Sequence, residues 1–221
     1  MVGAVAPPIL FHFDFISPYA YLAWTQIHAL AAKFGREVEP VPTLLAALLG
    51  HSGTLGPGEI PAKRIYTFKD VLRTAKVLGV PLAPPPSHPF NPLVALRVCG
   101  LPMEAGERTR LVDALFLATW GGGGGVETAE KVAAVATALG LDGNTLVELA
   151  SQPEAKERLK RVTDEAIAAD VFGVPTMRVD GELFWGFDSF GHLERALRGE
   201  DPLRSVDFSA FHGIRPSASR K

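Results

Sequence analysis

The pattern of apolar and polar positions near the start of the chain predicts a short strand running directly into a helix. Residues 10–15 are mainly apolar, and from residue 18 onward apolar side chains recur at helical spacing. Ser17 stands at the N-cap position and Pro18 at the first helical position. A serine oxygen satisfies a free amide of the first turn, and proline has no amide to leave unpaired. Gly35 then offers a left-handed stop.

The rest of the chain predicts a block of helices between two groups of strands. Residues 37–42 form a second strand, whose prolines confine it to a sheet edge, and residues 51–58 form a loop rich in Gly and Pro. Helical periodicity follows in residues 62–78, 92–101, 104–120, 128–139, 146–151 and 153–169. Residues 80–89 are proline-rich and predict an extended connector, and the glycine run 121–125 lacks the Gly-Lys-Ser/Thr of a phosphate loop.

Strand character returns only near the end. Residues 176–179 and 182–185 flank Asp180-Gly181, a strong hairpin signal, and residues 189–198 predict a closing helix. The last strands must join the first two in one sheet, because two strands alone cannot complete it. Ser17 then lies at a strand's C-terminal tip and a helix's positive end, where open α/β sheets bind ligands. A simple capping role is the alternative for Ser17.

Composition and charge narrow the possible functions. The chain has 221 residues, 47% hydrophobic and 21% charged, and 22 basic residues against 24 acidic ones leave a net charge of −2. This balance argues against a nucleic-acid or anionic-membrane partner. No apolar stretch approaches the roughly 20 residues that span a bilayer, and residues 1–10 lack the basic start of a signal peptide. We therefore expect a cytoplasmic protein with no membrane partner.

The single cysteine excludes redox chemistry based on a Cys-x-x-Cys pair. Cys99 can form neither an intrachain disulfide nor such a pair, and we expect a buried core thiol. The six histidines show no metal-ligand spacing, so we predict no metal site.

The βαβ start, the ββα finish and Val174-Pro175 before the hairpin describe a thioredoxin-like fold, with a central four-stranded mixed sheet and an inserted all-α domain. In that fold the proline is cis and faces the N-terminus of the first helix. Ser17 to Ala20 replace the usual Cys-x-x-Cys, so the protein is not a disulfide exchanger. We predict the first part of the thioredoxin-like domain at 8–62, the helical insertion at 63–167, the second part at 168–207 and a flexible tail at 208–221.

Six segments together resemble one family, the 2-hydroxychromene-2-carboxylate isomerases, which are similar to kappa-class glutathione transferases. The matching segments are residues 14–23, 61–66, 91–97, 116–120, 171–176 and 181–188, in the same order. The resemblance implies that glutathione supplies the missing sulfur, with the Ser17 hydroxyl and the first helix stabilising its thiolate. It also implies a homodimer.

The same resemblance assigns the remaining glutathione contacts. Val174 would pair its backbone with the cysteinyl part while Pro175 holds that geometry. Phe187 and Asp188 would receive the γ-glutamyl end, although Asp188 could instead cap the last helix. Lys63 would face the glycyl carboxylate, unless it is simply a solvated helix residue.

Three departures from the family pattern fall on ligand-facing segments. Thr54 stands where the family usually has asparagine, Asp188 is followed by Ser-Phe in place of Arg-Leu, and five glycines replace charged residues after Trp120. Four aromatic residues could form a wall for a flat aromatic substrate, with core packing as the alternative for each. These are Tyr19, Phe90, Trp120 and Trp185.

Three functions follow as hypotheses. The first is a glutathione-dependent isomerase acting on 2-hydroxychromene-2-carboxylate-type intermediates of aromatic degradation. The second is a kappa-like glutathione transferase or peroxidase, which uses the same thiolate against an electrophile that is consumed. The third is a non-catalytic thioredoxin-fold binding protein, which the departure at Thr54 favours.

Overall fold

The computed structural model describes residues 6–218 and contains one four-stranded sheet in the order β2-β1-β3-β4. Strand β1 (Ile9–Phe13) pairs in parallel with β2 (Val38–Pro42) and antiparallel with β3 (Thr176–Val179), and β3 pairs with β4 (Glu182–Trp185). The thioredoxin-like fold and its mixed sheet are thereby confirmed. Strand β2 is an edge strand, as its prolines predicted.

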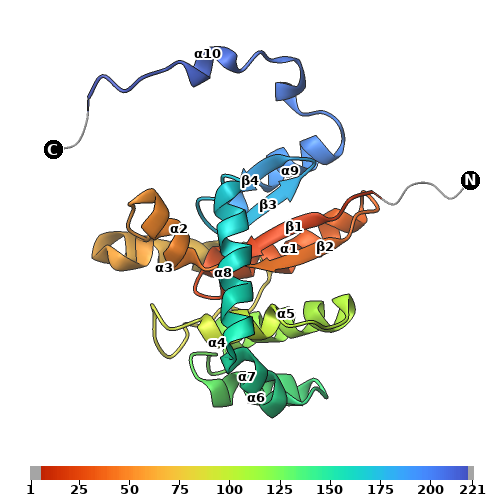
Figure 1. Cartoon of the computed structure of the whole chain (residues 1–221). Coiled ribbons are helices and arrows are strands. Elements are labelled where there is room, and N and C mark those ends of the chain that lie inside the picture. Colours follow the sequence, from red (N-terminus) through yellow and green to blue (C-terminus); the bar gives the residue numbers. More distant parts are fainter. Residues whose placement is uncertain (1–5, 219–221) are drawn as a thin grey trace, which may run out of the picture.

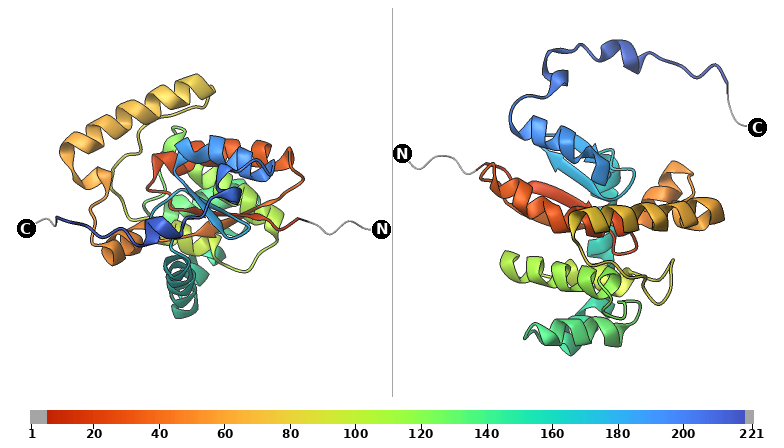
Figure 2. Two further views of the ribbon diagram at one scale, coloured as in Figure 1. Left: turned by 90° about the horizontal axis from the view of Figure 1, so that it is seen from above. Right: turned by 180° about the vertical axis from the view of Figure 1, so that it is seen from behind.

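Helices cover both faces of this sheet (Figures 1 and 2). Helix α1 (Pro18–Ala32) and helix α9 (Phe190–Leu197) lie on one face, and α8 (Pro153–Ala168) crosses the other. Side chains alternate along β1 between the two faces of the sheet. Phe11 and Phe13 therefore face α1, where both pack on Trp24. His12 points to the opposite face and bonds Thr43 Oγ1 through Nδ1 at 3.1 Å.

Besides α8, seven further helices lie between β2 and β3 in the chain. They are α2 (Leu45–Ser52), the short η1 (Pro57–Glu59), α3 (Pro61–Leu78), α4 (Leu93–Cys99), α5 (Ala105–Trp120), α6 (Ala129–Ala138) and α7 (Gly143–Ser151). Helix α5 packs against α1 and β2, and α6 and α7 lie beyond it (Figure 1). The periodicity predicted all of these except η1 and α2. The division of the chain at residues 62/63 and 167/168 remains our proposal.

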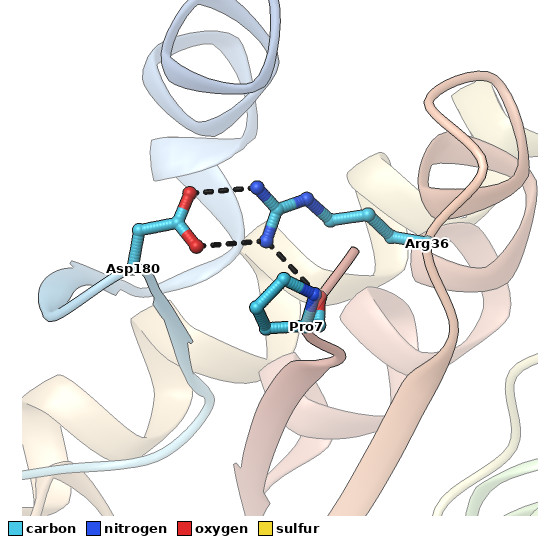
Figure 3. A network of polar contacts seen from close by, with 3 residues as sticks. All are labelled: Pro7, Arg36 and Asp180. Carbon is cyan, nitrogen blue, oxygen red and sulfur yellow. Dashed lines mark hydrogen bonds and ion pairs between the residues drawn. The ribbon is translucent and has the colours of Figure 1, made fainter. Parts of the chain in front are cut away.

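A cluster of hydrogen bonds holds the β3–β4 turn at the end of the sheet where β1 and β2 begin. Asp180 and Gly181 both have positive φ (52° and 96°), as a type I′ turn requires. Arg36 donates to both carboxylate oxygens of Asp180, at 3.0 and 2.6 Å, and also to the carbonyl of Pro7 at 3.0 Å (Figure 3). One guanidinium thus ties together the segment before β1, the segment before β2 and the β3–β4 turn.

The C-terminal residues run away from the body as an extended arm (Figures 1 and 2). Up to residue 218, the arm contains two short helical segments, η3 (Pro202–Ser205) and α10 (Ser209–His212), and residues 202–218 are exposed. Among residues 6–218, no helix combines the length and the hydropathy that crossing a membrane requires.

Candidate active site

Ser17 caps helix α1 at the tip of β1. Its backbone is extended (φ −92°, ψ 113°), its Oγ accepts a hydrogen bond from the Ala20 amide at 3.2 Å, and Pro18 occupies the first helical position. The first turn of α1 contains no acidic side chain. The helix dipole therefore favours an anion beside Ser17.

The segment before β3 meets Ser17 from the far end of the chain. The Val174–Pro175 peptide bond is cis. Ser17 Oγ donates to the carbonyl of Val174 at 3.4 Å, across 157 positions of sequence. Ser17 and Val174 are 7% and 8% exposed, so both lie on the floor of the site. Because 3.4 Å is long for a hydroxyl hydrogen bond, a ligand acceptor could take the hydroxyl proton at small cost.

A buried carboxylate organises the loop that carries Ser17. Asp14 accepts hydrogen bonds from the Ile16 amide at 3.1 Å and the Leu45 amide at 3.0 Å, while its carbonyl accepts from the Ser17 amide at 3.1 Å. Burial raises the pKa of Asp14 to about 6, against the lowering effect of the two amides. These bonds end β1 at Phe13, two residues before the predicted strand end. Sequence reasoning missed Asp14, although an acid within an apolar run was a usable signal.

Two ring nitrogens bind the next carbonyls of this loop. Trp120 Nε1 donates to the Phe15 carbonyl at 2.8 Å, and His88 Nε2 lies 3.0 Å from the Ile16 carbonyl. Trp120 is only 1% exposed. Trp120 therefore has the surroundings of the core-packing alternative, because the indole is packed in the core and its N–H holds the loop. His88 did not feature in the sequence prediction.

The other predicted wall residues occupy different surroundings. Tyr19 is half-buried, and its hydroxyl donates to Asp70 Oδ2 at 2.7 Å. Burial raises the pKa of Tyr19, and Asp70 adds to that effect. Phe90 is half-buried against the main core. Trp185 is 54% exposed, and its ring stands edge-on to Phe172 at a centroid distance of 5.0 Å.

The predicted γ-glutamyl contacts are joined to the cis-proline segment. Phe187 and Asp188 lie in η2 (Phe187–Ser189), which packs against α1, and the Gly186 amide donates to the Pro175 carbonyl at 2.8 Å. Asp188 is exposed, and its charge helps to raise the pKa of Tyr19. The carboxylate therefore lies on the same side of the site as Tyr19.

Thr54 and Lys63 lie just after α2 and in the first turn of α3, respectively. Thr54 Oγ1 lies 2.9 Å from Ser52 Oγ at the end of α2. Lys63, in the first turn of α3, lines a pocket of about 350 Å³ together with Pro57, Ala62, Tyr66 and Thr67. Both side chains are exposed. The structure thus brings Ser17 together with Val174 and Pro175. Thr54 and Lys63 lie on the surface in the region of α2 and α3.

The chain's own thiol takes no part in this site. Cys99 is fully buried, and burial raises the pKa of its thiol far above neutral pH. Within residues 6–218, no three His, Cys, Asp or Glu side chains are grouped so that they could hold a metal ion. The chemistry available at Ser17 is therefore hydrogen bonding to an anion at a helix N-terminus.

Comparison with known proteins places this geometry in a family. Residues 8–198 match the family described as the DSBA-like thioredoxin domain. A 2-hydroxychromene-2-carboxylate isomerase of Pseudomonas putida is 32% identical over 190 residues, which cover 85% of this chain and 92% of the relative. The chain belongs to the 2-hydroxychromene-2-carboxylate isomerase family. The resemblance in the sequence is therefore confirmed, and with it the assignment to a family of isomerases.

Solved structures and more distant relatives agree with this membership. A structure of 2-hydroxychromene-2-carboxylate isomerase superposes with a TM-score of 0.79 at 30% identity, covering 86% of this chain and 94% of that one. A kappa 1 glutathione S-transferase of Caenorhabditis elegans is 26% identical, covering 89% of this chain and 93% of the relative. The chain is thus also similar to kappa-class glutathione transferases.

Proposed function

We propose that this protein is a glutathione-dependent isomerase acting on 2-hydroxychromene-2-carboxylate or a close analogue. The observation that carries the proposal is the position of Ser17 Oγ, which lies 3.4 Å from the Val174 carbonyl at the N-terminus of α1. The chain supplies a hydroxyl and a helix end there but no thiolate of its own. Membership of the isomerase family and the kappa-class relatives support glutathione as the source of sulfur.

The residues present fit a bound thiol tripeptide. A hydroxyl donor and a helix N-terminus lower the pKa of a thiol beside them, because they stabilise the anion. Asp188 presents an exposed carboxylate suited to an ammonium group, and Lys63 an ammonium suited to a carboxylate. The Val174 backbone would pair with the central residue, and Pro175 and Phe187 would shape that subsite. Thr54 would offer a hydroxyl where relatives have an amide.

Glutathione, when bound, supplies a thiolate that adds to the conjugated substrate and later leaves unchanged, so isomerisation consumes none of it. Ser17 would donate to that sulfur and hold it as the anion at the N-terminus of α1. Over the whole reaction, the substrate's ring C–O bond would open and a carbon–carbon bond would rotate, giving a trans-benzylidenepyruvate. Tyr19, Phe90 and Trp185 would contact the flat aromatic acid.

The test compares isomerisation with and without glutathione in the wild type and in Ser17→Ala. We expect no turnover without glutathione and about a hundredfold lower kcat/KM in the variant. Ser17→Ala also removes a helix cap, which costs about 1 kcal/mol. Thr128→Ala is the matched control, because Thr128 caps α6 in the same way by accepting from the Lys131 amide. Turnover that ignores both glutathione and Ser17→Ala would refute the proposal.

The kappa-class relatives favour a second candidate, a glutathione transferase or peroxidase using the same thiolate. An electrophilic aromatic halide assayed beside the chromene measures the preference between the two. A thermal shift with millimolar glutathione addresses the third hypothesis, since a ligand raises stability by mass action. No shift would favour a binding protein with another partner. We also propose a homodimer, to be checked by sedimentation equilibrium.

A further inference from the structure

The proline-rich connector between α3 and α4 is tied to the body at successive points. We call residues 80–92 the strap. Near its start, the Tyr21 hydroxyl donates to the Pro81 carbonyl at 2.7 Å. Two residues later, the Ala83 amide donates to the Trp120 carbonyl at 2.6 Å. The strap is therefore held by α1 on one side and by α5 on the other.

The third tie falls on the loop that carries Ser17. His88, near the end of the strap, lies with Nε2 3.0 Å from the carbonyl of Ile16, the residue before Ser17. A carbonyl can only accept, so Nε2 carries the proton. The imidazole packs edge-on to Phe68 at 5.4 Å and tilts against Trp120 at 5.6 Å. Its position is thus set by α3 and α5 together.

Neither ring nitrogen of His88 is available to exchange a proton with a substrate. Nε2 is engaged by the carbonyl, and Nδ1 is buried without a hydrogen-bond partner among residues 6–218. Burial lowers the pKa of His88, with Arg64 acting in the same direction, against the raising effect of the Ile16 carbonyl. The ring is therefore neutral at pH 7 and keeps the single proton that the Ile16 carbonyl requires.

With His88 in place, every polar backbone group from the Phe15 carbonyl to the Ser17 carbonyl is bound. Trp120 and His88 hold the two carbonyls, Asp14 holds the two amides, and the Ser17 carbonyl accepts from the Tyr21 amide. A hydroxyl aimed by such a loop loses little entropy when it meets a ligand, and a misplacement of about 1 Å can cost a hundredfold in rate.

We propose that His88 is a positioning residue, which holds the Ile16 carbonyl so that the Ser17 hydroxyl points at the bound sulfur. This inference rests on the proposed function of Ser17. Through His88, the strap would connect helices α3 and α5 to the peptide that precedes Ser17. Loss of the bond would disorient the hydroxyl more than it would weaken binding of the tripeptide.

Three variants separate the hydrogen bond from the packing. His88→Phe keeps an aromatic ring against Phe68 and Trp120 but cannot donate, while His88→Gln restores a donor. His28→Phe is the matched control, because His28 is also half-buried and stands edge-on to a tryptophan, Trp24, at 4.5 Å. For each variant we would measure kcat, the Kd for glutathione and the ultraviolet absorbance of the bound thiolate against pH.

In His88→Phe we expect kcat to fall about tenfold, the pKa of the bound thiol to rise by about one unit, and the Kd to change less than about threefold. His88→Gln should recover most of the loss, and His28→Phe should match the wild type. A His88→Phe enzyme with wild-type kcat and thiolate titration would overturn the inference. So would a His88→Gln enzyme no better than His88→Phe.

Hydrogen exchange in the ligand-free protein keeps this test independent of glutathione. We expect the Ile16 and Ser17 amides to exchange about tenfold faster in His88→Phe than in the wild type or His28→Phe, because the loop opens locally more often. If the wild type binds no glutathione, the proposed function fails, and exchange at these two amides alone decides the role of His88. Unchanged exchange would then refute it.

Discussion

The two sides of the candidate site are built in opposite ways. On one side, Ser17 and Val174 are buried, and the loop before Ser17 has its backbone bound by Asp14, His88 and Trp120. On the other side, Thr54 and Lys63 are exposed and lack such a frame. The difference indicates a division of labour. In the proposed function, the rigid side would aim the hydroxyl that faces the sulfur, and the exposed side would adapt to the end of the ligand farthest from the reaction.

The largest effect we expect concerns the rigid side and its dependence on pH. Asp14 has a folded-state pKa of about 6, above the ordinary value of 3.8. The folded protein therefore binds the proton more tightly, so stability rises as pH falls through this window and is lost as pH rises. Relative to Asp14→Asn, the wild type should gain about 2.5 kcal/mol in free energy of unfolding between pH 7.5 and pH 4. Urea denaturation measures this difference.

Asp142 provides the control for that experiment. It caps α7 at an exposed position, and hydrogen bonds from Thr145 lower its pKa. Its contribution is present above the ordinary pKa and is lost as pH falls, so the difference between the wild type and Asp142→Asn should run in the opposite direction. If stability changed with pH in the same direction for both aspartates, the raised pKa of Asp14 would be contradicted.

The exposed side should show a smaller effect, of a different kind. Lys63→Met removes the charge proposed to face the glycyl carboxylate. We expect the KM for glutathione to rise about five- to tenfold with kcat nearly unchanged, because a contact equal in ground and transition states affects binding alone. Lys69→Met is the control, since Lys69 is exposed on the same helix outside the pocket. A fall in kcat for Lys63→Met would break the division between the two sides.

The smallest effect should come from the clamp at the far end of the sheet. Arg36→Met removes the paired bonds to Asp180 and the bond to Pro7 (Figure 3). We expect a loss of about 0.5–1 kcal/mol in free energy of unfolding, because the Asp180 carboxylate remains 56% exposed to solvent even though the Arg36 side chain is mostly covered. Activity should not change. Lys160→Met, which breaks an exposed pair with Asp164, should cost less in the same denaturation assay.

Local signals in the sequence predicted a large part of this structure. Ser17 with Pro18 located the start of α1, and Asp180-Gly181 located the β3–β4 turn. The prolines of β2 placed it at the edge. Each of these features depends on neighbours within a few residues, so a single sequence carries the information.

Features set by distant contacts could not be predicted in this way. Helix α2 has no side-chain cap from Leu44, and its first amides are bound instead by Thr163 and Asp14. The bonds from His88 and Trp120 to the Ser17 loop cross 72 and 105 positions of sequence. No local rule links such residues, so the sequence alone could not predict that Trp120 and His88 bind the carbonyls of this loop.

The order of strands also bears on biosynthesis. Strand β1 is central in the sheet, yet its neighbour β3 lies near the end of the chain, with Leu10 opposite Arg178. At translation rates of about 5–20 residues per second, β1 waits on the order of ten seconds on the ribosome before β3 is made. During that interval an aromatic strand has one unpaired edge, which is the kind of surface that chaperones shield from aggregation.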